Sequence, residues 1–291
     1  MSDVYLPASL DEVHAIRKRA PDAVILGGGT DLLVRMRATG KKPSVLIGLE
    51  LIAELSRITL QDGFIRIGPM VTHQALLDSP VIRQHLPLVH KAAQVLGSPP
   101  IRHMGTIGGN ICTASPAGDI LPALYVLDAG LEISSPAGKR IVPIQEFITG
   151  PGKTILSNTE ILSGVRVKVP DPRYQGYYLK VGQRKSLAIS IISMAALLMV
   201  SPDKKILSAR FAWGSVGPIV MRFPDIESSL AGRTFGPDLL LEVGRRTSER
   251  IQPIRDIRAS ASYRKMVAEG LPLKILEECS EKLPSTKKNH E

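Results

Sequence analysis

The stretch Val24-Ile25-Leu26-Gly27-Gly28-Gly29-Thr30-Asp31-Leu32-Leu33 decides how the first part of this chain folds. Its leading apolar residues indicate a short buried strand, because they end abruptly in turn residues. The three consecutive glycines remove every Cβ from the following turn, so the backbone can adopt positive φ and its N–H groups can approach a ligand closely. Phosphate is the ligand that such a loop favours.

The segments on both sides of this loop complete a small α/β unit. Upstream, residues 9–12 (Ser-Leu-Asp-Glu) form a capping box that starts a helix over 10–19. Downstream, Thr30 or Asp31 can cap a second helix, which leads to another apolar run. The order helix, strand, glycine loop, helix, strand predicts a parallel sheet. We assign residues 1–55 to this first subdomain.

Period-two alternation begins at Ile58 and marks a second subdomain, over residues 56–170. Its first two strands flank Asp62-Gly63, a turn pair that favours a hairpin. A second glycine-rich loop spans 97–117, and Asp119 is well placed to cap the helix that follows. The other elements expected here are helices over 72–78 and 85–96, a helix ending at Leu127, and strands over 131–134, 140–143 and 161–169.

A third unit is expected over residues 171–291, because Pro170-Asp171-Pro172 has the composition of a connector. The expected elements are strands over 177–183, 188–200 and 206–213, followed by helices near 225–231, 237–251 and 258–278. The fold class predicted for the whole chain is therefore α+β. It consists of two N-terminal α/β subdomains and a C-terminal domain in which helices accompany a three-stranded sheet.

Composition excludes several classes of function. The only two cysteines, Cys112 and Cys279, are far apart in the sequence, and the six histidines form no HxxxH or HxH pattern. We therefore expect no disulfide framework, no iron–sulfur cluster and no other metal site in this chain. The net charge of +10 is spread along the chain, with five Phe and one Trp for base stacking, which argues against nucleic-acid binding. A basic surface that meets an acidic partner or an anionic cofactor is the remaining interpretation.

The sequence shows neither a secretory leader nor a membrane span. Its first ten residues lack a basic segment with an apolar core. The longest apolar run, 187–200, is shorter than the ~18 residues that a span requires, so it indicates a buried strand. We expect a cytoplasmic protein without a membrane contact.

The second glycine-rich segment, Gly105 to Ser115, adds two adjacent glycines and several hydroxyl and amide side chains. A diphosphate with sugar hydroxyls needs that mixture of groups. The usual nucleotide fingerprints are absent, since a GxGxxG motif starting at Gly27 would need glycine where Leu32 stands, and no GxxxxGK[ST] motif occurs. From the residues alone, each loop could also be a structural turn.

Both loops resemble the FAD-binding segments of the flavin subunits of xanthine dehydrogenase and carbon monoxide dehydrogenase. The segments that carry the resemblance are Ile25 to Leu33, Thr106 to Asn110, Ala114 to Asp119, Gly150 to Thr154, Glu160 to Leu162, Lys180 to Arg184, and Arg258 to Arg264. Together they span nearly the whole chain. The resemblance implies the bipartite FAD-binding fold of the vanillyl-alcohol oxidase type, with FAD extended between the two N-terminal subdomains.

The resemblance also implies roles for individual residues. The backbone of the two loops would wrap the pyrophosphate, and the hydroxyls of Thr30 and Thr113 would donate to it. Asp31 and Asp119 would repel a diphosphate, so each is expected to cap a helix or to accept from ribityl or ribose hydroxyls. The expected cofactor-binding residues are Leu26, Gly27, Gly28, Gly29, Thr30, Asp31, Leu32, Thr106, Ile107, Gly108, Gly109, Asn110, Thr113, Asp119, Leu162 and Lys180. No residue is expected to be catalytic and none to bind a metal.

Two of these residues have a plain structural alternative. Lys180 matches a lysine near the flavin ring, where a cation would favour the anionic reduced flavin, but it could also be a solvated lysine at a strand start. Leu162 matches an apolar position beside the cofactor, or it could be ordinary core. Leu96 stands where the animal xanthine enzymes have an aromatic ring near the flavin, so ring stacking as in those enzymes is not expected.

The function implied by the resemblance is that of a flavin subunit of a molybdenum hydroxylase, similar to bacterial xanthine dehydrogenase. A molybdenum-binding subunit would oxidise a heteroaromatic substrate, an iron–sulfur subunit would relay single electrons, and the FAD on this chain would collect them and reduce NAD. Three alternatives stay open. They are a flavin subunit of a carbon monoxide, nicotinate or other heteroaromatic dehydrogenase with a quinone or oxygen acceptor, a self-contained oxidase of the vanillyl-alcohol type, and a flavin-free assembly scaffold.

Overall fold

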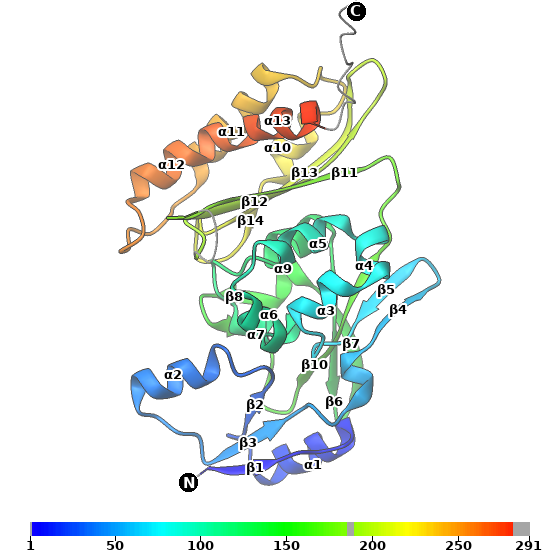
Figure 1. Cartoon of the computed structure of the whole chain (residues 1–291), viewed down its shortest axis with the longest axis vertical. Helices are drawn as coiled ribbons and strands as arrows, with labels where there is room; N and C mark the ends of the chain where they lie inside the picture. Colours follow the sequence, from blue (N-terminus) through cyan, green and yellow to red (C-terminus); the bar gives the residue numbers. More distant parts are fainter. Residues whose placement is uncertain (1, 185–188, 282–291) are drawn as a thin grey trace, which may run out of the picture.

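A computed structural model describes residues 2–184 and 189–281 of the chain. Figure 1 shows the chain extending along one long axis, from the N-terminal elements in blue to the C-terminal helices in red. Four sheets are present in the described part, and three of them organise the molecule: a parallel one, a five-stranded one and a four-stranded one. Each of these three is described below with the helices that cover it.

The N-terminal sheet is parallel, as the sequence predicted, with strand order β1-β3-β2. Its strands are β1 (Asp3–Tyr5), β2 (Val24–Leu26) and β3 (Val45–Gly48), of which β1 was not predicted. Helix α1 (Leu10–Arg19) packs on it through Val13 and Ile16, and the Ser9 hydroxyl accepts from the Glu12 amide at 3.2 Å. Helix α2 (Leu32–Thr39) has no buried residue and protrudes from the molecule (Figure 1).

The middle of the chain forms an antiparallel sheet of order β4-β5-β10-β6-β7. Its strands are β4 (Ile58–Gln61), β5 (Phe64–Ile67), β6 (Gly130–Ser135), β7 (Gly138–Pro143) and β10 (Ile161–Lys168). The predicted hairpin at Asp62-Gly63 is confirmed, since β4 pairs with β5. A small hairpin of β8 (Ile148–Gly150) and β9 (Lys153–Thr154), and helix α9 (Ile144–Phe147) before it, were not predicted.

The helices of this middle unit differ from the prediction in two places. Helix α3 (His73–Asp78) is as expected, and the helix expected over 85–96 is α5 (Pro87–Gln94), which starts at Pro87 because proline has no N–H to continue a helix and starts a new one well. Helix α4 (Pro80–His85) before it was not predicted. The segment expected as a loop over 97–117 contains α6 (Pro99–Met104) and α7 (Ile107–Thr113). Adjacent glycines disfavour a helix in isolation, so only the surrounding packing makes α7 form.

The C-terminal unit is a four-stranded antiparallel sheet of order β11-β12-β13-β14. The three predicted strands are β11 (Gln175–Val181), β12 (Ile192–Val200) and β13 (Ile206–Gly214), and the two-residue β14 (Met221–Arg222) is additional. The expected start of the second strand at residue 188 lies outside the described residues. Helices α10 (Pro224–Ser228) and α11 (Pro237–Arg250) follow. The single helix expected over 258–278 is α12 (Ala261–Gly270), a 3-10 turn at Leu271–Leu273 and α13 (Lys274–Glu281).

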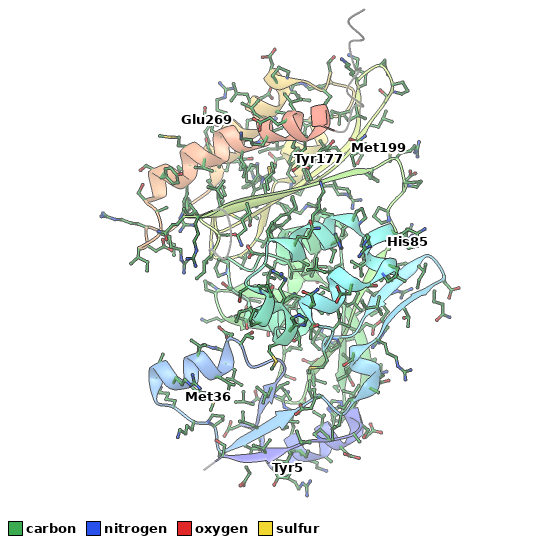
Figure 2. The ribbon with its side chains drawn as sticks, viewed as in Figure 1. Tyr5, Met36, His85, Tyr177, Met199 and Glu269 are labelled. Carbon is green, nitrogen blue, oxygen red and sulfur yellow. The ribbon has the colours of Figure 1, made fainter. Side chains whose placement is uncertain are left out.

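Strand β12 is apolar except at Ser193, because both of its faces are covered. Met194, Ala196 and Leu198 face the C-terminal helices, in a core that also holds Tyr177, labelled in Figure 2 and 1% exposed. Ala195 and Leu197 face the core of the middle unit, where β12 contacts α8 (Leu121–Val126). The sheet thereby attaches the C-terminal helices to the middle unit. No described helix is long and apolar enough to span a membrane.

Candidate functional site

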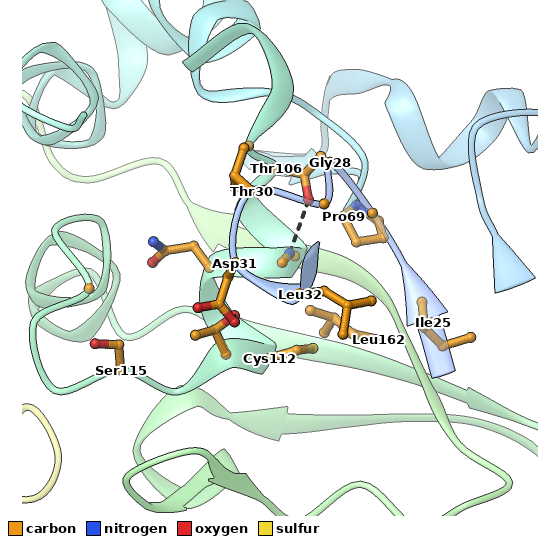
Figure 3. Close-up of a pocket in the computed structure, with 18 of the residues that line it drawn as sticks. Ile25, Gly28, Thr30, Asp31, Leu32, Pro69, Thr106, Cys112, Ser115 and Leu162 are labelled. Carbon is orange, nitrogen blue, oxygen red and sulfur yellow. Dashed lines mark hydrogen bonds between the residues drawn. The ribbon is translucent and has the colours of Figure 1, made fainter. Parts of the chain in front are cut away.

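A cavity of about 670 Å³ lies between the N-terminal unit and the middle unit. That volume is typical of sites for small molecules and cofactors. All the predicted cofactor-binding residues line it except Leu26, Ile107 and Lys180. Figure 3 shows residues from β2, the first glycine loop, α7 and β10 around this space, although they are far apart in the sequence.

Two glycines, one in each loop, allow close contacts beside the cavity. A Cβ at Gly28 would lie 1.6 Å from the carbonyl oxygen of Met104, and a Cβ at Gly108 would lie 2.5 Å from Cβ of Pro69. Both neighbours belong to the backbone or to a proline ring, so neither can move aside. Gly29 has a φ of +71°, a region in which glycine is favoured. These three glycines are therefore needed by the fold itself.

Gly109 has a different surrounding. A Cβ there would meet only the hydroxyl oxygen of Thr106, at 3.0 Å, and Gly109 lines the cavity. The Thr106 hydroxyl caps α7 by accepting from the Gly109 amide at 3.0 Å (Figure 3). The absence of a side chain at Gly109 therefore keeps the cavity open.

Three buried polar atoms of the cavity lining have no hydrogen-bond partner among the described residues. They are Nε of Arg17, Nδ1 of His73 and Oδ1 of Asn110. Buried polar groups are nearly always hydrogen-bonded in folded proteins, so unpaired ones at a cavity point to a ligand. Together with the side-chain-free surface at Gly109, they fit a cofactor that has both donors and acceptors, as FAD does.

Asp31 does not cap α2 with its side chain, although it occupies the N-cap position. Its carboxylate accepts from the Thr113 hydroxyl at 3.3 Å and pairs with Arg35 at 2.8 Å. The expectation that Thr30 or Asp31 caps this helix is therefore wrong, because the carboxylate has a charged partner one turn along the helix. Asp31 and Thr113 instead join the first loop to α7 across the cavity wall.

Asp119 does not cap α8, whose N-cap position is occupied by Ile120. The Asp119 carboxylate pairs with Lys180 at 2.7 Å and accepts from the Ser190 hydroxyl at 2.6 Å. Burial raises the pKa of Asp119, and the nearby ammonium group opposes that rise. Asp119 therefore bridges the cavity lining and the C-terminal sheet.

Lys180 lies behind the cavity rather than in its lining. Its side chain is 9% exposed, and its ammonium group also donates to the carbonyl of Val95 at 2.9 Å. The interpretation of Lys180 as a solvated lysine is therefore wrong. Because its ammonium group binds Asp119, Lys180 can affect a ligand through that carboxylate.

The remaining predicted residues divide between the lining and the core. Leu162, which is 2% exposed, and Leu96, which is 6% exposed, both line the cavity. Ile107 is fully buried in the core of the middle unit, and Leu26 lies in β2 outside the lining. Sequence patterns place a motif, but they do not say which of its side chains point away from a ligand.

The cavity also contains residues that no motif indicated. They are Arg17, Met70, His73, Ile101, Asn158 and Ile189, among others. His73 and Arg17 belong to helices whose sequence shows only amphipathic patterning. The one signal in the sequence was a charged or polar side chain at a position that the amphipathic pattern of the helix predicts to be buried.

The pKa of His73 should make the stability of the FAD-free chain depend on pH. Burial, and to a smaller extent the charge of Arg102, lowers the pKa of His73 from 6.5 to about 4. The unfolded chain then binds a proton at a higher pH than the folded chain does. The contribution of His73 to the free energy of unfolding should be fully present above about pH 6.5. The free energy of unfolding should fall by about 3 kcal/mol through this group as the pH decreases to about 4.

The measurement is denaturant unfolding at about pH 7.5 and about pH 4 for the wild type, His73→Gln and the control His103→Gln, which changes an exposed histidine of α6. His73→Gln should lose less stability on acidification than the wild type, and His103→Gln should behave like the wild type. Equal losses in the wild type and His73→Gln would contradict the prediction.

Two family models match the chain and leave few residues unmatched. "FAD binding domain in molybdopterin dehydrogenase" matches residues 1–172, and "CO dehydrogenase flavoprotein C-terminal domain" matches residues 177–279. Among solved structures, carbon monoxide dehydrogenase from Hydrogenophaga pseudoflava is similar with a TM-score of 0.90 and 27% identity, covering 95% of this chain and 96% of the other.

Two sequence relatives are similar over most of their length. The nicotinate dehydrogenase FAD-subunit of Eubacterium barkeri is 30% identical, covering 94% of each chain. The putative xanthine dehydrogenase FAD-binding subunit of Escherichia coli K12 is 31% identical, covering 89% of each chain. These matches confirm the predicted fold class and FAD as the cofactor, and they contradict the flavin-free scaffold. The chain therefore belongs to the FAD-binding flavoprotein subunits of the molybdopterin dehydrogenases, a family of oxidoreductases.

Proposed function

We propose that this chain holds one FAD in the cavity between its two glycine loops and passes electrons from an iron–sulfur subunit to NAD. The enzyme would be a molybdenum hydroxylase similar to xanthine dehydrogenase, with its heteroaromatic substrate bound on a molybdenum-binding subunit. The observation that supports this most is the joining of both loops, Gly27 to Asp31 and Thr106 to Asn110, around one 670 Å³ cavity. We also propose boundaries near residues 55 and 170 for the two FAD-binding subdomains and the C-terminal domain.

Different residues of the cavity would bind different groups of FAD. The open backbone at Gly27 and Gly109 can approach a diphosphate, because no side chain of either residue intervenes. Asn110 and His73 supply polar atoms that have no partner in the part of the chain that the structure describes. FAD, when bound, accepts either a hydride or single electrons, which suits a link between a one-electron relay and NAD.

The charged groups at the Asp119 end of the cavity can set the electrostatic potential around the flavin ring of FAD. Lys180 holds the Asp119 carboxylate at 2.7 Å, and Ser190 donates to the other carboxylate oxygen at 2.6 Å. The carboxylate is thus fixed by a cation and a hydroxyl, both behind the lining. Lys180 and Ser190 position Asp119, and Asp119 is the residue that reaches the cavity.

Because the proposal assigns only the flavin reactions to this chain, it makes a direct prediction for the purified full chain. Its bound FAD should be bleached by anaerobic NADH, because hydride transfer needs only the nicotinamide and the flavin. Xanthine, hypoxanthine and nicotinate should each leave the flavin oxidised. Adding the iron–sulfur and molybdenum subunits should connect one of these substrates to the flavin. The measurement is the visible flavin absorption in an anaerobic cuvette.

Each unexpected result of this experiment has a definite meaning. Bleaching by xanthine or nicotinate without any partner would contradict the subunit role and favour a self-contained oxidase. An FAD that NADH does not bleach would shift the acceptor to oxygen or a quinone and leave the cofactor site unchanged. Nicotinate is included because the nicotinate dehydrogenase relative, at 30% identity, is as similar as the putative xanthine dehydrogenase relative, at 31%.

A further inference from the structure

Helix α1 contributes one cation to the cavity, Arg17. Its Nη1 donates to the backbone carbonyl of Glu160 at 2.7 Å, and its Nε is buried with no partner among the described residues. The Glu160 carboxylate is engaged elsewhere, since it pairs with Arg140 at 2.8 Å. Within residues 2–184 and 189–281, no carboxylate forms an ion pair with Arg17.

The other two arginines of the lining are neutralised by carboxylates. Arg35 pairs with Asp31 at 2.8 Å, and Arg258 pairs with Asp256 at 3.1 Å. Burial lowers the pKa of Arg17, and no acidic neighbour opposes this. Arg17 is half-buried, and a buried donor such as its Nε is unfavourable unless something accepts from it. A ligand in the cavity is the partner that the lining makes available.

We place Arg17 at one end of the cavity from the elements around it. Its helix packs in one core with Ile25 of β2, the strand that leads into the first glycine loop, and its Nη1 bonds Glu160, next to Ile161 of the lining. The three residues of β2 span about 10 Å, so the start of this strand lies about that distance from the first glycine loop. The opposite end is lined by Ser115, and Figure 3 shows Ile25 and Ser115 on opposite sides of Asp31.

A diphosphate at the glycine loops would place the two halves of FAD at these two ends. The flavin half must meet other electron carriers, and the end at Asp119 includes Ile189, which is 57% exposed. The Arg17 end includes Leu49 and Ile161, each 3% exposed, which suit an aromatic base. Adenine ring nitrogens are acceptors, and a guanidinium can donate to them or stack on the ring.

We propose that Arg17 recognises the adenosine half of FAD and gives the site its preference for FAD over FMN. This rests on the proposed function, because it requires FAD in this cavity with its diphosphate at the glycine loops. Arg17 would bind adenine or its ribose through Nε and the face of the guanidinium, while Nη1 stays on the Glu160 carbonyl.

The test is a titration of the FAD-free full chain with FAD, FMN and ADP, followed by flavin fluorescence and by competition for ADP. Arg17→Leu should weaken FAD and ADP binding about tenfold or more and leave FMN binding unchanged. Arg17→Lys keeps the charge but loses the planar donor set, so it should recover only part of the loss. Arg19→Leu, which changes an exposed arginine of the same helix, should bind all three ligands like the wild type.

Thermal unfolding of each FAD-free variant separates a binding defect from a folding defect. Equal weakening of FAD and FMN binding, or unchanged binding of FAD and ADP, would overturn the assignment of Arg17. If Arg17→Leu does not fold, the Arg17→Lys titration decides, because unchanged discrimination between FAD and FMN in that variant would also overturn it. A wild-type chain that binds no FAD would contradict the proposed function instead.

Discussion

Gly109→Val should yield a folded protein that no longer holds FAD. A Cβ at Gly109 meets only the Thr106 hydroxyl, at 3.0 Å, so a small shift of that one side chain accommodates the change. The two γ-carbons of valine would stand where the cavity is lined by bare backbone. Valine should therefore occupy the space that we assign to the diphosphate and keep its oxygens away from the loop amides.

The measurement is the ratio of FAD to protein in the purified variant, with thermal unfolding of the FAD-free forms beside it. Gly270→Val is the matched control, because Gly270 also lies in a helix, α12, and a Cβ there meets no atom within 4 Å. We expect full FAD in the control and almost none in Gly109→Val, with similar stabilities of their FAD-free forms. A Gly109→Val protein with a full complement of FAD would show that the diphosphate lies elsewhere.

Gly28→Ala should destabilise the fold, although alanine adds only one carbon. That carbon would lie 1.6 Å from the carbonyl oxygen of Met104 and 2.4 Å from the carbonyl carbon, so the first loop and the end of α6 would have to separate. Overpacking against side chains costs about 1–3 kcal/mol, and we expect at least the upper value against a rigid backbone. FAD binding should fall as well, because the two loops would no longer form one site.

The free energy of unfolding of the FAD-free form checks this prediction, since bound FAD would itself stabilise the folded state. Gly270→Ala serves as the control and should be at least as stable as the wild type, because alanine favours a helix more than glycine does. A Gly28→Ala protein as stable as the wild type would mean that the two loops do not touch in this way. The Gly28 and Gly109 variants, one in each loop, thus distinguish a glycine that the fold needs from one that FAD binding needs.

Local sequence was sufficient where an element depends on its own residues. The capping box at Ser9 starts α1, the Asp62-Gly63 turn joins β4 to β5, and the apolar run before Gly27 forms β2. Prediction from local sequence failed where contacts with other parts of the chain decide the structure. Glycines 108 and 109 made the second loop resemble an irregular turn, yet the Thr106 hydroxyl and contact with Pro69 hold it as α7.

The sequence by itself determined that two glycine loops exist and that their residues suit a diphosphate. The tertiary structure decided which glycine serves the fold and which serves the cavity, because that depends on Met104 and Pro69, which are distant in the chain from the glycines they oppose. It also decided that Asp119 pairs with Lys180, 61 residues away, instead of capping α8. Capping residues and carboxylates in ion pairs have the same local signature, and only the three-dimensional distance between charges distinguishes them.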